Sequence, residues 1–127
     1  MPSKVYDTRF FVELFYSKDK DQSNRLNTQK TTTQKYASTV TIHEIYQLTI
    51  AKEGKETAKT RTTLIAKTFA LIPVDEQIAQ TSAELRHKYQ LSMGDSMIAA
   101  TAQKLNATCI TDDPHFQQIK EIKTTWI

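Results

Sequence analysis

The sequence predicts an α/β fold with a central, mostly parallel sheet of about five strands between two layers of helices. Short apolar runs suited to buried strands alternate with longer segments whose apolar residues recur at helical spacing. A chain of 127 residues can bury roughly two-thirds of its unfolded surface in one core. Glycine and proline are scarce, at 2 and 3 residues. We therefore expect one well-folded domain over residues 1–127.

The N-terminal part of the chain should contain two strands and three helices. The strands are expected at residues 5–6 and 37–40, and each precedes a helix. Thr41 can cap the second helix, Gly54 ends it, and a third helix follows as far as Phe69. The residues that share a face of these helices are Phe10, Phe11, Leu14 and Phe15, then Ile42, Ile45 and Leu48, then Ala58, Thr62, Ile65 and Phe69.

The C-terminal part alternates in the same way. The expected strands are at residues 71–74, 108–111 and 124–127. Pro73 argues that the first of these lies at a sheet edge or ends there. Asp75 caps the next helix and Asp95 opens another. The residues that share a face of these two helices are Ile78, Ser82, Leu85 and Tyr89, then Ile98, Thr101, Ala102 and Leu105.

Charge, hydropathy and cysteine content argue against a membrane protein and against a disulfide-bonded secreted protein. The net charge is +3, and basic residues gather in two polar stretches: Lys18, Lys20, Arg25, Lys30 and Lys35, then Lys52, Lys55, Lys59 and Arg61. In the stretch 18–35 we expect a poorly anchored helix. No apolar run approaches the ~20 residues that span a bilayer, and the N-terminus lacks the apolar core of a signal peptide. The single Cys109 is expected to be a small core residue in a reducing cytoplasm.

Acidic residues occur beside the predicted elements at four places. Asp7 follows the first strand, and Glu44 lies near the start of the second helix. Asp95 opens a helix, and Asp113 follows the strand at 108–111. Ligands gather at the carboxyl ends of the strands in parallel sheets. We therefore expect the four carboxylates to face the same edge of the sheet.

Each acid also has a purely structural interpretation: Asp7 as a strand end, Asp95 as an N-cap, Glu44 as a first-turn acid, and Asp112-Asp113-Pro114 as a turn. Their joint placement at one edge argues against four separate structural roles. The basic stretches, read alone, are ordinary solvated helix faces. Beside a pooled acidic site they favour a polyanionic ligand.

Converging carboxylates need a partner of opposite charge. Two carboxylates about 4 Å apart repel by roughly 4 kcal/mol at an effective dielectric near 20, and a bound Mg²⁺ or Mn²⁺ reverses that sign. Hard cations take oxygen ligands, whereas His43, His87 and His115 share no ligand spacing, which argues against zinc. A metal held by carboxylates can activate water and stabilise charge on phosphorus, which is the chemistry of a nuclease.

Short motifs stand beside the predicted elements. Two of them are Asp7-Thr8 after one strand and Thr41-x-x-Glu44 after the next. A longer block contains Glu84-Leu85-Arg86, Tyr89-x-Leu91-Ser92 and Gly94-Asp95-Ser96-x-Ile98-Ala99-Ala100-Thr101-Ala102. The last motif is Thr111-Asp112-Asp113-x-x-Phe116. In this order they resemble the opening motifs, the central block and the final motif of PIN domains, and of VapC-like toxins in particular. The resemblance covers essentially the whole chain and is most specific in its last third.

The resemblance implies a three-layer α/β/α PIN fold and a metal-dependent ribonuclease. The implied ligands of Mg²⁺ or Mn²⁺ are Asp7, Glu44, Asp95 and Asp113. Asp113 fits the family's fourth acid better than Asp112, because its distance to Phe116 matches. Thr111 would hydrogen-bond to one of the metal-binding carboxylates without touching the metal itself, and Thr8 is a weaker candidate for that role.

Two residues depart from the family's pattern. Asp112 stands where the family often has a basic residue, so it adds negative charge beside the site. Arg9 stands where a small residue is common. Its guanidinium would either contact RNA phosphate or form a structural ion pair, and the sequence favours neither.

The resemblance also implies partners: an RNA substrate, a second copy in a homodimer, and a VapB-like antitoxin that inserts a peptide near the acids. The groove for this peptide would be lined by Phe11, Phe15, Tyr46 and the helix over residues 55–69. Two alternatives remain open: a stand-alone PIN nuclease for RNA processing, and a non-catalytic binding module that kept the fold. A phosphoacceptor receiver domain is disfavoured, because the acid pair lies at the wrong end of the chain.

Overall fold

Five parallel strands form the central sheet of the computed structural model, which describes residues 2–17 and 34–127. The strands are β1 (Ser3–Tyr6), β2 (Gln34–Ser38), β3 (Ala70–Ile72), β4 (Thr108–Ile110) and β5 (Lys123–Thr125). Their order across the sheet is β3-β2-β1-β4-β5. The predicted α/β fold and its parallel sheet are confirmed. The edge position inferred from Pro73 is also confirmed, because β3 ends one residue before it at the rim of the sheet.

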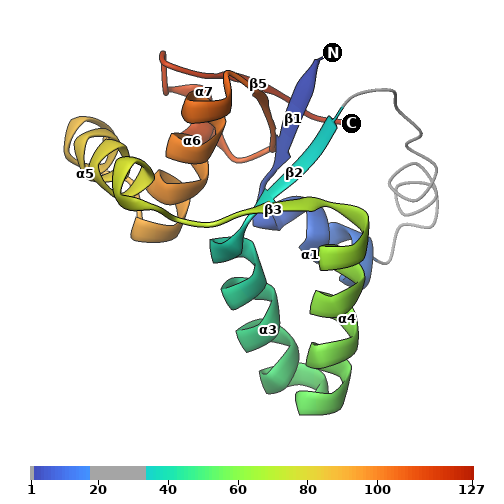
Figure 1. Ribbon diagram of the computed structural model, residues 1–127. Helices are drawn as coiled ribbons and strands as arrows, with labels where there is room; N and C mark the ends of the chain where they lie inside the picture. The colour runs from blue at the N-terminus through green and yellow to red at the C-terminus, as the bar shows by residue number, and fades with distance from the viewer. Residues whose placement is uncertain (1, 18–33) are drawn as a thin grey trace.

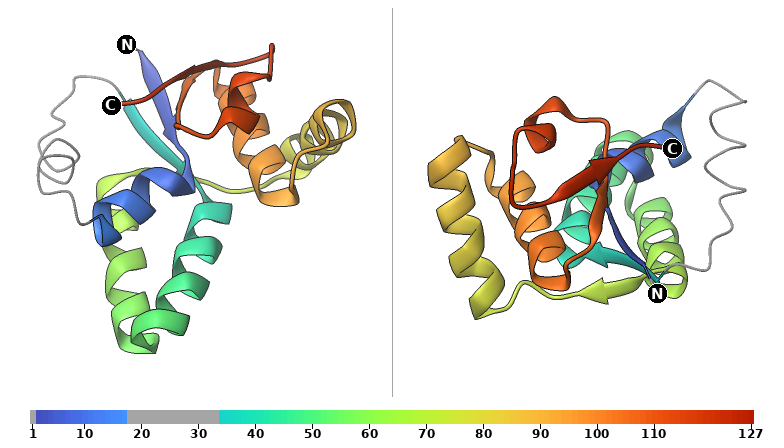
Figure 2. Two further views of the ribbon diagram at one scale, coloured as in Figure 1. Left: turned by 180° about the vertical axis from the view of Figure 1, so that it is seen from behind. Right: turned by 90° about the horizontal axis from the view of Figure 1, so that it is seen from above.

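Helices cover both faces of this sheet. They are α1 (Thr8–Tyr16), α3 (Thr39–Glu53), α4 (Lys55–Thr68), α5 (Glu76–Tyr89), α6 (Met93–Leu105) and α7 (Pro114–Gln117). Figure 1 shows α3 and α4 as an antiparallel pair on the opposite side of the strands from α5. Seen from above, α5 and α6 lie on one side of the sheet, and α1 and α4 on the other (Figure 2). This is the three-layer arrangement expected.

Side chains of neighbouring strand residues point to opposite faces and so divide the core in two. Val5 and Cys109 belong to the cluster under α5, α6 and α7, whereas Tyr6 and Ile110 belong to the cluster under α1, α3 and α4. This is the period-two alternation of a strand buried on both faces. Cys109 is fully buried, so the expectation of a core cysteine is met.

Two helix starts differ from the prediction. Thr41 does not cap α3; Ser38 does, and its side chain accepts a hydrogen bond from Val40 N–H at 3.1 Å. Asp95 does not open α6 either, because Ser92 is the N-cap and its side chain accepts from Asp95 N–H at 3.2 Å. In both places several polar residues near the start of the helix could serve as the N-cap. The N-cap residue is the one that stands where the preceding segment ends.

Other expectations hold with shifted boundaries. Asp75 caps α5 by accepting from Ile78 N–H, and Gly54 ends α3 with φ +92°. The strands expected at 71–74, 108–111 and 124–127 each end at least one residue earlier. The helix expected over 18–35 falls mostly on residues outside the described ones. Within the described residues, no helix combines the length and apolarity that crossing a membrane requires.

The strand order reverses direction between β1 and β4. From β1 the chain moves outward to β2 and β3, then crosses back to place β4 on the other side of β1. In open α/β sheets this switch point, at the carboxyl ends of the strands, is where ligands bind. The residues that follow β1 and β4 therefore occupy the position where a binding site is expected.

Candidate metal centre

Asp7 links the two strands at the switch point. Its backbone N–H donates to the carbonyl of Ile110 at 3.1 Å, which ties the end of β1 to β4. The side chain is 2% exposed, and its Oδ2 accepts a hydrogen bond from Thr111 Oγ1 at 2.8 Å. Although Asp7 is the N-cap residue of α1, its side chain makes no cap hydrogen bond. Neither helix capping nor solvation accounts for a carboxylate here.

Thr111 connects Asp7 to the loop that carries the last acid. While its hydroxyl donates to Asp7, the same oxygen accepts from Asp113 N–H at 3.1 Å. The residue is 2% exposed. Thr111 therefore links a carboxylate to the backbone of a second acid.

Glu44 is held between the starts of α1 and α6. It lies in the second turn of α3, whose first turn contains no acid, so its interpretation as a first-turn acid was wrong. Its Oε1 accepts from Thr8 Oγ1 at 2.6 Å, and Thr8 Oγ1 lies 3.1 Å from Thr41 Oγ1. On its other side, a Cβ atom added to Gly94 would lie 2.6 Å from Glu44 Oε2. The absence of a side chain at Gly94 thus makes room for this carboxylate.

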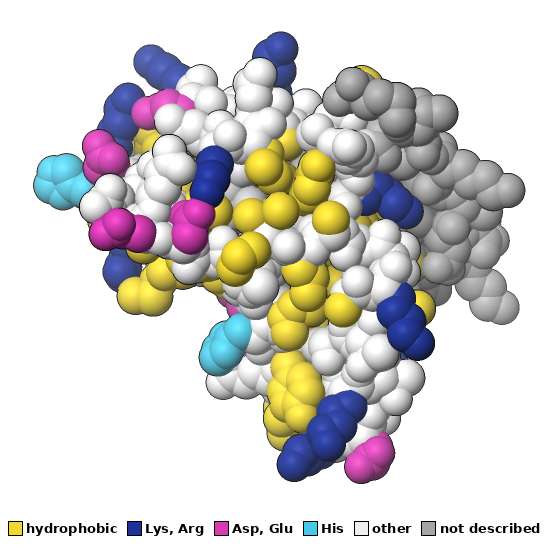
Figure 3. Space-filling model, viewed as in Figure 1, with side chains coloured by type: hydrophobic (Ala, Val, Ile, Leu, Met, Phe, Trp, Pro, Cys, Tyr) yellow, Lys and Arg dark blue, Asp and Glu magenta, His cyan; other side chains and the backbone are white. Residues whose placement is uncertain are grey.

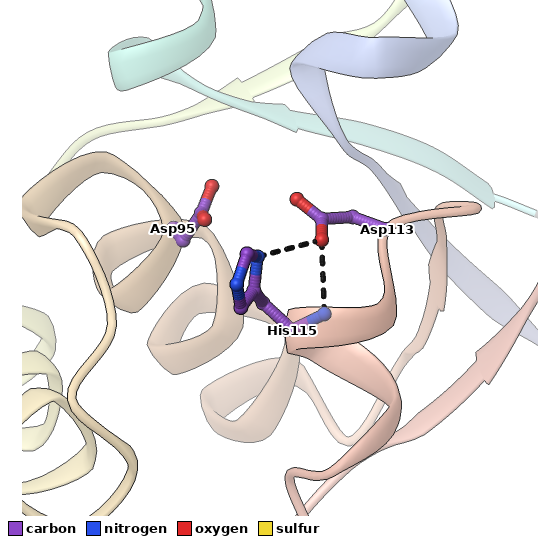
Figure 4. A group of neighbouring side chains, drawn as sticks. All are labelled: Asp95, Asp113 and His115. Carbon is purple, nitrogen blue, oxygen red and sulfur yellow. Dashed lines mark hydrogen bonds and ion pairs between the residues drawn. The ribbon is translucent and has the colours of Figure 1, made fainter.

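Asp113 and His115 form the far side of the cluster. Asp113 is the N-cap of α7, and its Oδ1 accepts from His115 N–H at 2.9 Å. The structural interpretation of this acid as part of a turn therefore holds alongside any other role. The His115 Nδ1 lies 2.9 Å from the same oxygen. Figure 4 shows the ring beside Asp113, with Asp95 reaching from α6 toward the same space.

Donor atoms of three residues already lie close enough to share an ion. One atom each from Asp95, Asp113 and His115 lie within 4.8 Å of one another. His115 is a member of this group that the sequence did not indicate as a ligand. Gly94 is a second residue whose role was missed, although it stands in the quoted motif.

The carboxylates perturb one another. Burial raises the pKa of Asp7 to about 7, aided by the charges of Asp95 and Glu44 and opposed by the hydrogen bond from Thr111. Burial also raises the pKa of Asp95, and the charges of Asp113 and Glu44 add to the effect. All four acids therefore share one electrostatic field. Perturbation of this kind is typical of functional sites.

Arg9 and Asp112 pair with each other at the border of this cluster. Arg9 Nε and Nη2 donate to the two carboxylate oxygens of Asp112, each at 3.1 Å. Arg9 Nη2 also lies 3.6 Å from Glu13 Oε1. The Arg9 guanidinium lowers the pKa of Asp112 below its usual value. The extra carboxylate of Asp112 is thus neutralised by Arg9, and the ion pair foreseen for Arg9 is present.

The donor set fits a hard divalent cation. Asp95 and Asp113 offer oxygen atoms in the close group, and the charges of Asp7 and Glu44 act on the same carboxylates. The space at Gly94 is occupied by Glu44. Mg²⁺ and Mn²⁺ prefer such oxygen ligands. A cation between the acids would offset the burial of their negative charge, which is the main cause of the raised pKa values, and the smaller contribution of their mutual repulsion.

A separate apolar pocket of about 220 Å³ opens between α1 and α4. Phe11 and Phe15 line it, together with Leu64 and Phe69 from the end of α4, whereas Tyr46 is not among its lining residues. The aromatic residues that line this pocket therefore come from β1, from α1 and from Phe69 just after α4, and none comes from α3. Tyr6 also lines the pocket, and its buried hydroxyl has no hydrogen-bond partner among the described residues.

Solved structures of toxin–antitoxin proteins share this fold. A toxin–antitoxin complex from Klebsiella pneumoniae is 28% identical, with 98% of this chain and 100% of that chain covered and a TM-score of 0.75. The VapBC2 complex of Rickettsia felis, bound to promoter DNA, is 17% identical over 98% of each chain, with a TM-score of 0.81. VapC20 of Mycobacterium tuberculosis, a sarcin–ricin loop cleaving toxin, is 18% identical over 95% of this chain and 99% of that chain, with a TM-score of 0.78.

The family is shown by one of the sequence comparisons. No curated protein sequence matches the chain significantly. The PIN domain family matches residues 4–122, which include all four acids and both flanks of the switch point. PIN domains are generally nucleases that depend on a divalent metal. The chain belongs to the PIN domain family.

Proposed function

We propose that this chain is a Mg²⁺- or Mn²⁺-dependent endoribonuclease and the toxin of a VapBC-like toxin–antitoxin pair. The observation that carries the proposal is the meeting of Asp7, Glu44, Asp95 and Asp113 at the switch point of the sheet, in one electrostatic field. Membership of the PIN family and the fold shared with VapBC toxins support it. We further propose that the chain acts as a homodimer in the cytoplasm, as the resemblance implies.

In this proposal the four carboxylates hold the metal and Thr111 keeps Asp7 oriented. A bound divalent ion supplies an activated water and charge stabilisation at the scissile phosphate. Thr8 orients Glu44 through its 2.6 Å hydrogen bond. Arg9, which is exposed beside the acids, contacts a neighbouring RNA phosphate, and Asp112 modulates that contact by competing for the guanidinium.

The proposed antitoxin peptide occupies the pocket between α1 and α4. The pocket is apolar, its neighbour Leu64 is 52% exposed, and Lys35, Lys59 and Lys67 surround this surface. Figure 3 shows dark blue Lys and Arg side chains over the α3–α4 end of the molecule and hydrophobic side chains in the middle of the same face. A peptide with apolar anchors and acidic flanks complements such a surface.

The test is a carboxylate-to-amide exchange in the cluster. Asp95→Asn should abolish RNA cleavage while the protein stays folded, because it relieves repulsion without removing a cap. Asp75→Asn is the matched control, since asparagine keeps the N-cap of α5 far from the cluster. Undiminished cleavage by purified Asp95→Asn, or full activity in excess EDTA, would contradict the proposal.

The stand-alone nuclease remains the second candidate. It would catalyse the same reaction as the toxin and would differ from it in having no antitoxin. A small adjacent gene for a DNA-binding protein with an apolar, acidic tail would support the toxin. The observation that would favour the non-catalytic module is the departure of Arg9 and Asp112 from the family's pattern. Because these two residues pair with each other, they leave the four acids available to a metal. Metal binding without RNA cleavage would favour the module.

A further inference from the structure

We propose that His115 supplies an imidazole nitrogen to the metal held by the acids, so that the site selects transition-metal ions over Mg²⁺. The inference rests on the proposed metal-dependent function and adds a nitrogen ligand to an otherwise all-oxygen site. It begins from the position of the ring beside Asp113 and Asp95 (Figure 4).

The spacing of the donor atoms fits shared coordination. His115 Nδ1 lies 2.9 Å from Asp113 Oδ1, and one donor from each of Asp95, Asp113 and His115 lies within 4.8 Å of the others. In an octahedral site with bonds of about 2.1 Å, adjacent ligands are about 3.0 Å apart and opposite ligands about 4.2 Å apart. The separation of Nδ1 and Oδ1 therefore fits adjacent ligands on one ion as well as it fits a hydrogen bond.

The backbone at His115 is held in place, whereas the ring itself is accessible. The next residue, Phe116, is fully buried and anchors α7, and His115 N–H is bonded to Asp113. The His115 side chain is 70% exposed, and in residues 2–17 and 34–127 its ring makes a hydrogen bond to Asp113 alone. Apart from that hydrogen bond, no contact in the described structure commits the imidazole to a role in the fold.

A nitrogen ligand changes which ions the site prefers. Carboxylate and water ligands suit Mg²⁺, whereas imidazole binds ions such as Co²⁺ and Ni²⁺ better. Mg²⁺ also keeps its waters more firmly. With His115 bound directly, the ratio of Co²⁺ to Mg²⁺ affinity should be high, and it should fall when the imidazole is removed.

A second role for the ring makes a different prediction. If Nδ1–H only donates to Asp113, the ring orients a ligand from outside the coordination shell. Loss of the ring would then lower the affinity for every ion by a similar factor. The ratio between ions therefore separates direct coordination from orientation of Asp113.

The experiment measures metal dissociation constants by calorimetry on tag-free protein at one pH, for Co²⁺, Mn²⁺ and Mg²⁺. The variants are His115→Ala, His115→Gln and, as a matched control, the exposed His87→Ala on α5. Thermal melting checks the fold, and pulsed EPR of the Mn²⁺ complexes detects coupling to a coordinated nitrogen. Asp95→Asn reports whether the ion occupies the proposed acid cluster.

We expect both His115 variants to lose Co²⁺ affinity by about tenfold or more, with a much smaller change for Mg²⁺. The nitrogen coupling should disappear in both and persist in His87→Ala. An equal loss for all ions, or a wild-type Mn²⁺ spectrum without nitrogen coupling, would overturn the inference while leaving the proposed function intact. Absence of metal binding to the wild type, or binding unaffected by Asp95→Asn, would overturn both.

Discussion

Gly94 and Glu44 are in such close contact that a Cβ atom on Gly94 would lie 2.6 Å from Glu44 Oε2. Gly94→Ala should therefore displace the carboxylate, which sits at the end of a flexible side chain. We expect RNA cleavage to fall by on the order of 10²-fold, as for an Å-scale misplacement in a site. Stability should be unchanged or should rise by up to ~1 kcal/mol, because alanine favours the helix. Cleavage assays and thermal melting measure the two effects.

Gly54 is the control for Gly94, because its substitution should lower stability without changing cleavage. Gly54 has φ +92° and no atom within 4 Å of an added Cβ, so Gly54→Ala strains the backbone far from the acids. It should cost about 1–3 kcal/mol of stability and leave cleavage of the folded protein unaltered. If Gly94→Ala kept full activity, Glu44 would not need its observed position.

The stability of the metal-free protein should fall as pH rises. The folded state raises the pKa of Asp7 from 3.8 to about 7, so it binds more protons than the unfolded state between these values. The stabilisation is complete below about pH 4 and is lost through about pH 7, a change of ~4 kcal/mol for one such group. Urea titrations in EDTA between pH 4 and pH 8 would measure it.

Asp7→Asn should flatten that pH dependence and make the metal-free protein more stable at pH 8, while abolishing metal binding. The amide can still accept the hydrogen bond from Thr111. Asp75→Asn, at an exposed helix cap, should leave the slope in place. An unchanged slope in Asp7→Asn would mean that another group controls the titration.

The pair Arg9–Asp112 should tune RNA affinity more than stability. Its side chains are 46% and 33% exposed, so breaking the pair should cost no more than about 1 kcal/mol. Asp112→Asn frees the guanidinium and removes a negative charge, and should lower KM for RNA. Arg9→Ala should raise KM. Equal effects of the two variants would indicate a purely structural ion pair.

Leu64 should matter for inhibition and not for catalysis. Leu64→Asp changes a residue that lines the pocket but is 52% exposed, so the fold and RNA cleavage should persist. Inhibition by the cognate antitoxin should weaken by at least about tenfold, because the charge enters an apolar contact. Ile50→Asp, at a residue 45% exposed on α3, is the matched control. Pull-down and inhibition assays would compare them.

The parallel sheet and the end-of-strand acids could be predicted because each depends on local pattern. Asp7 and Asp113 follow apolar runs, and parallel strands bring their carboxyl ends to one edge. The strand order was not accessible, because it depends on which pairs of strands meet in three dimensions. The switch point between β1 and β4 therefore appears only in the structure.

The errors have local causes. Ser38 rather than Thr41 caps α3, because the end of β2, set by its pairing with β1 and β3, determines where the helix begins. His115 could not be recognised as a neighbour of Asp95, since the sequence does not specify how α7 approaches α6. Gly94 stands in the central motif, and its role becomes visible only through its contact with Glu44 in the structure.

The hydrogen bond between Asp7 and Thr111 joins residues 104 positions apart, across the two central strands. On a translating ribosome, at 5–20 residues per second, Thr111 is made about 5–20 seconds after Asp7. The nascent chain cannot close β1 against β4, or gather its acids, before the C-terminal part has emerged. A nuclease built in this order would be inert until the segment that contains Thr111 has left the ribosome.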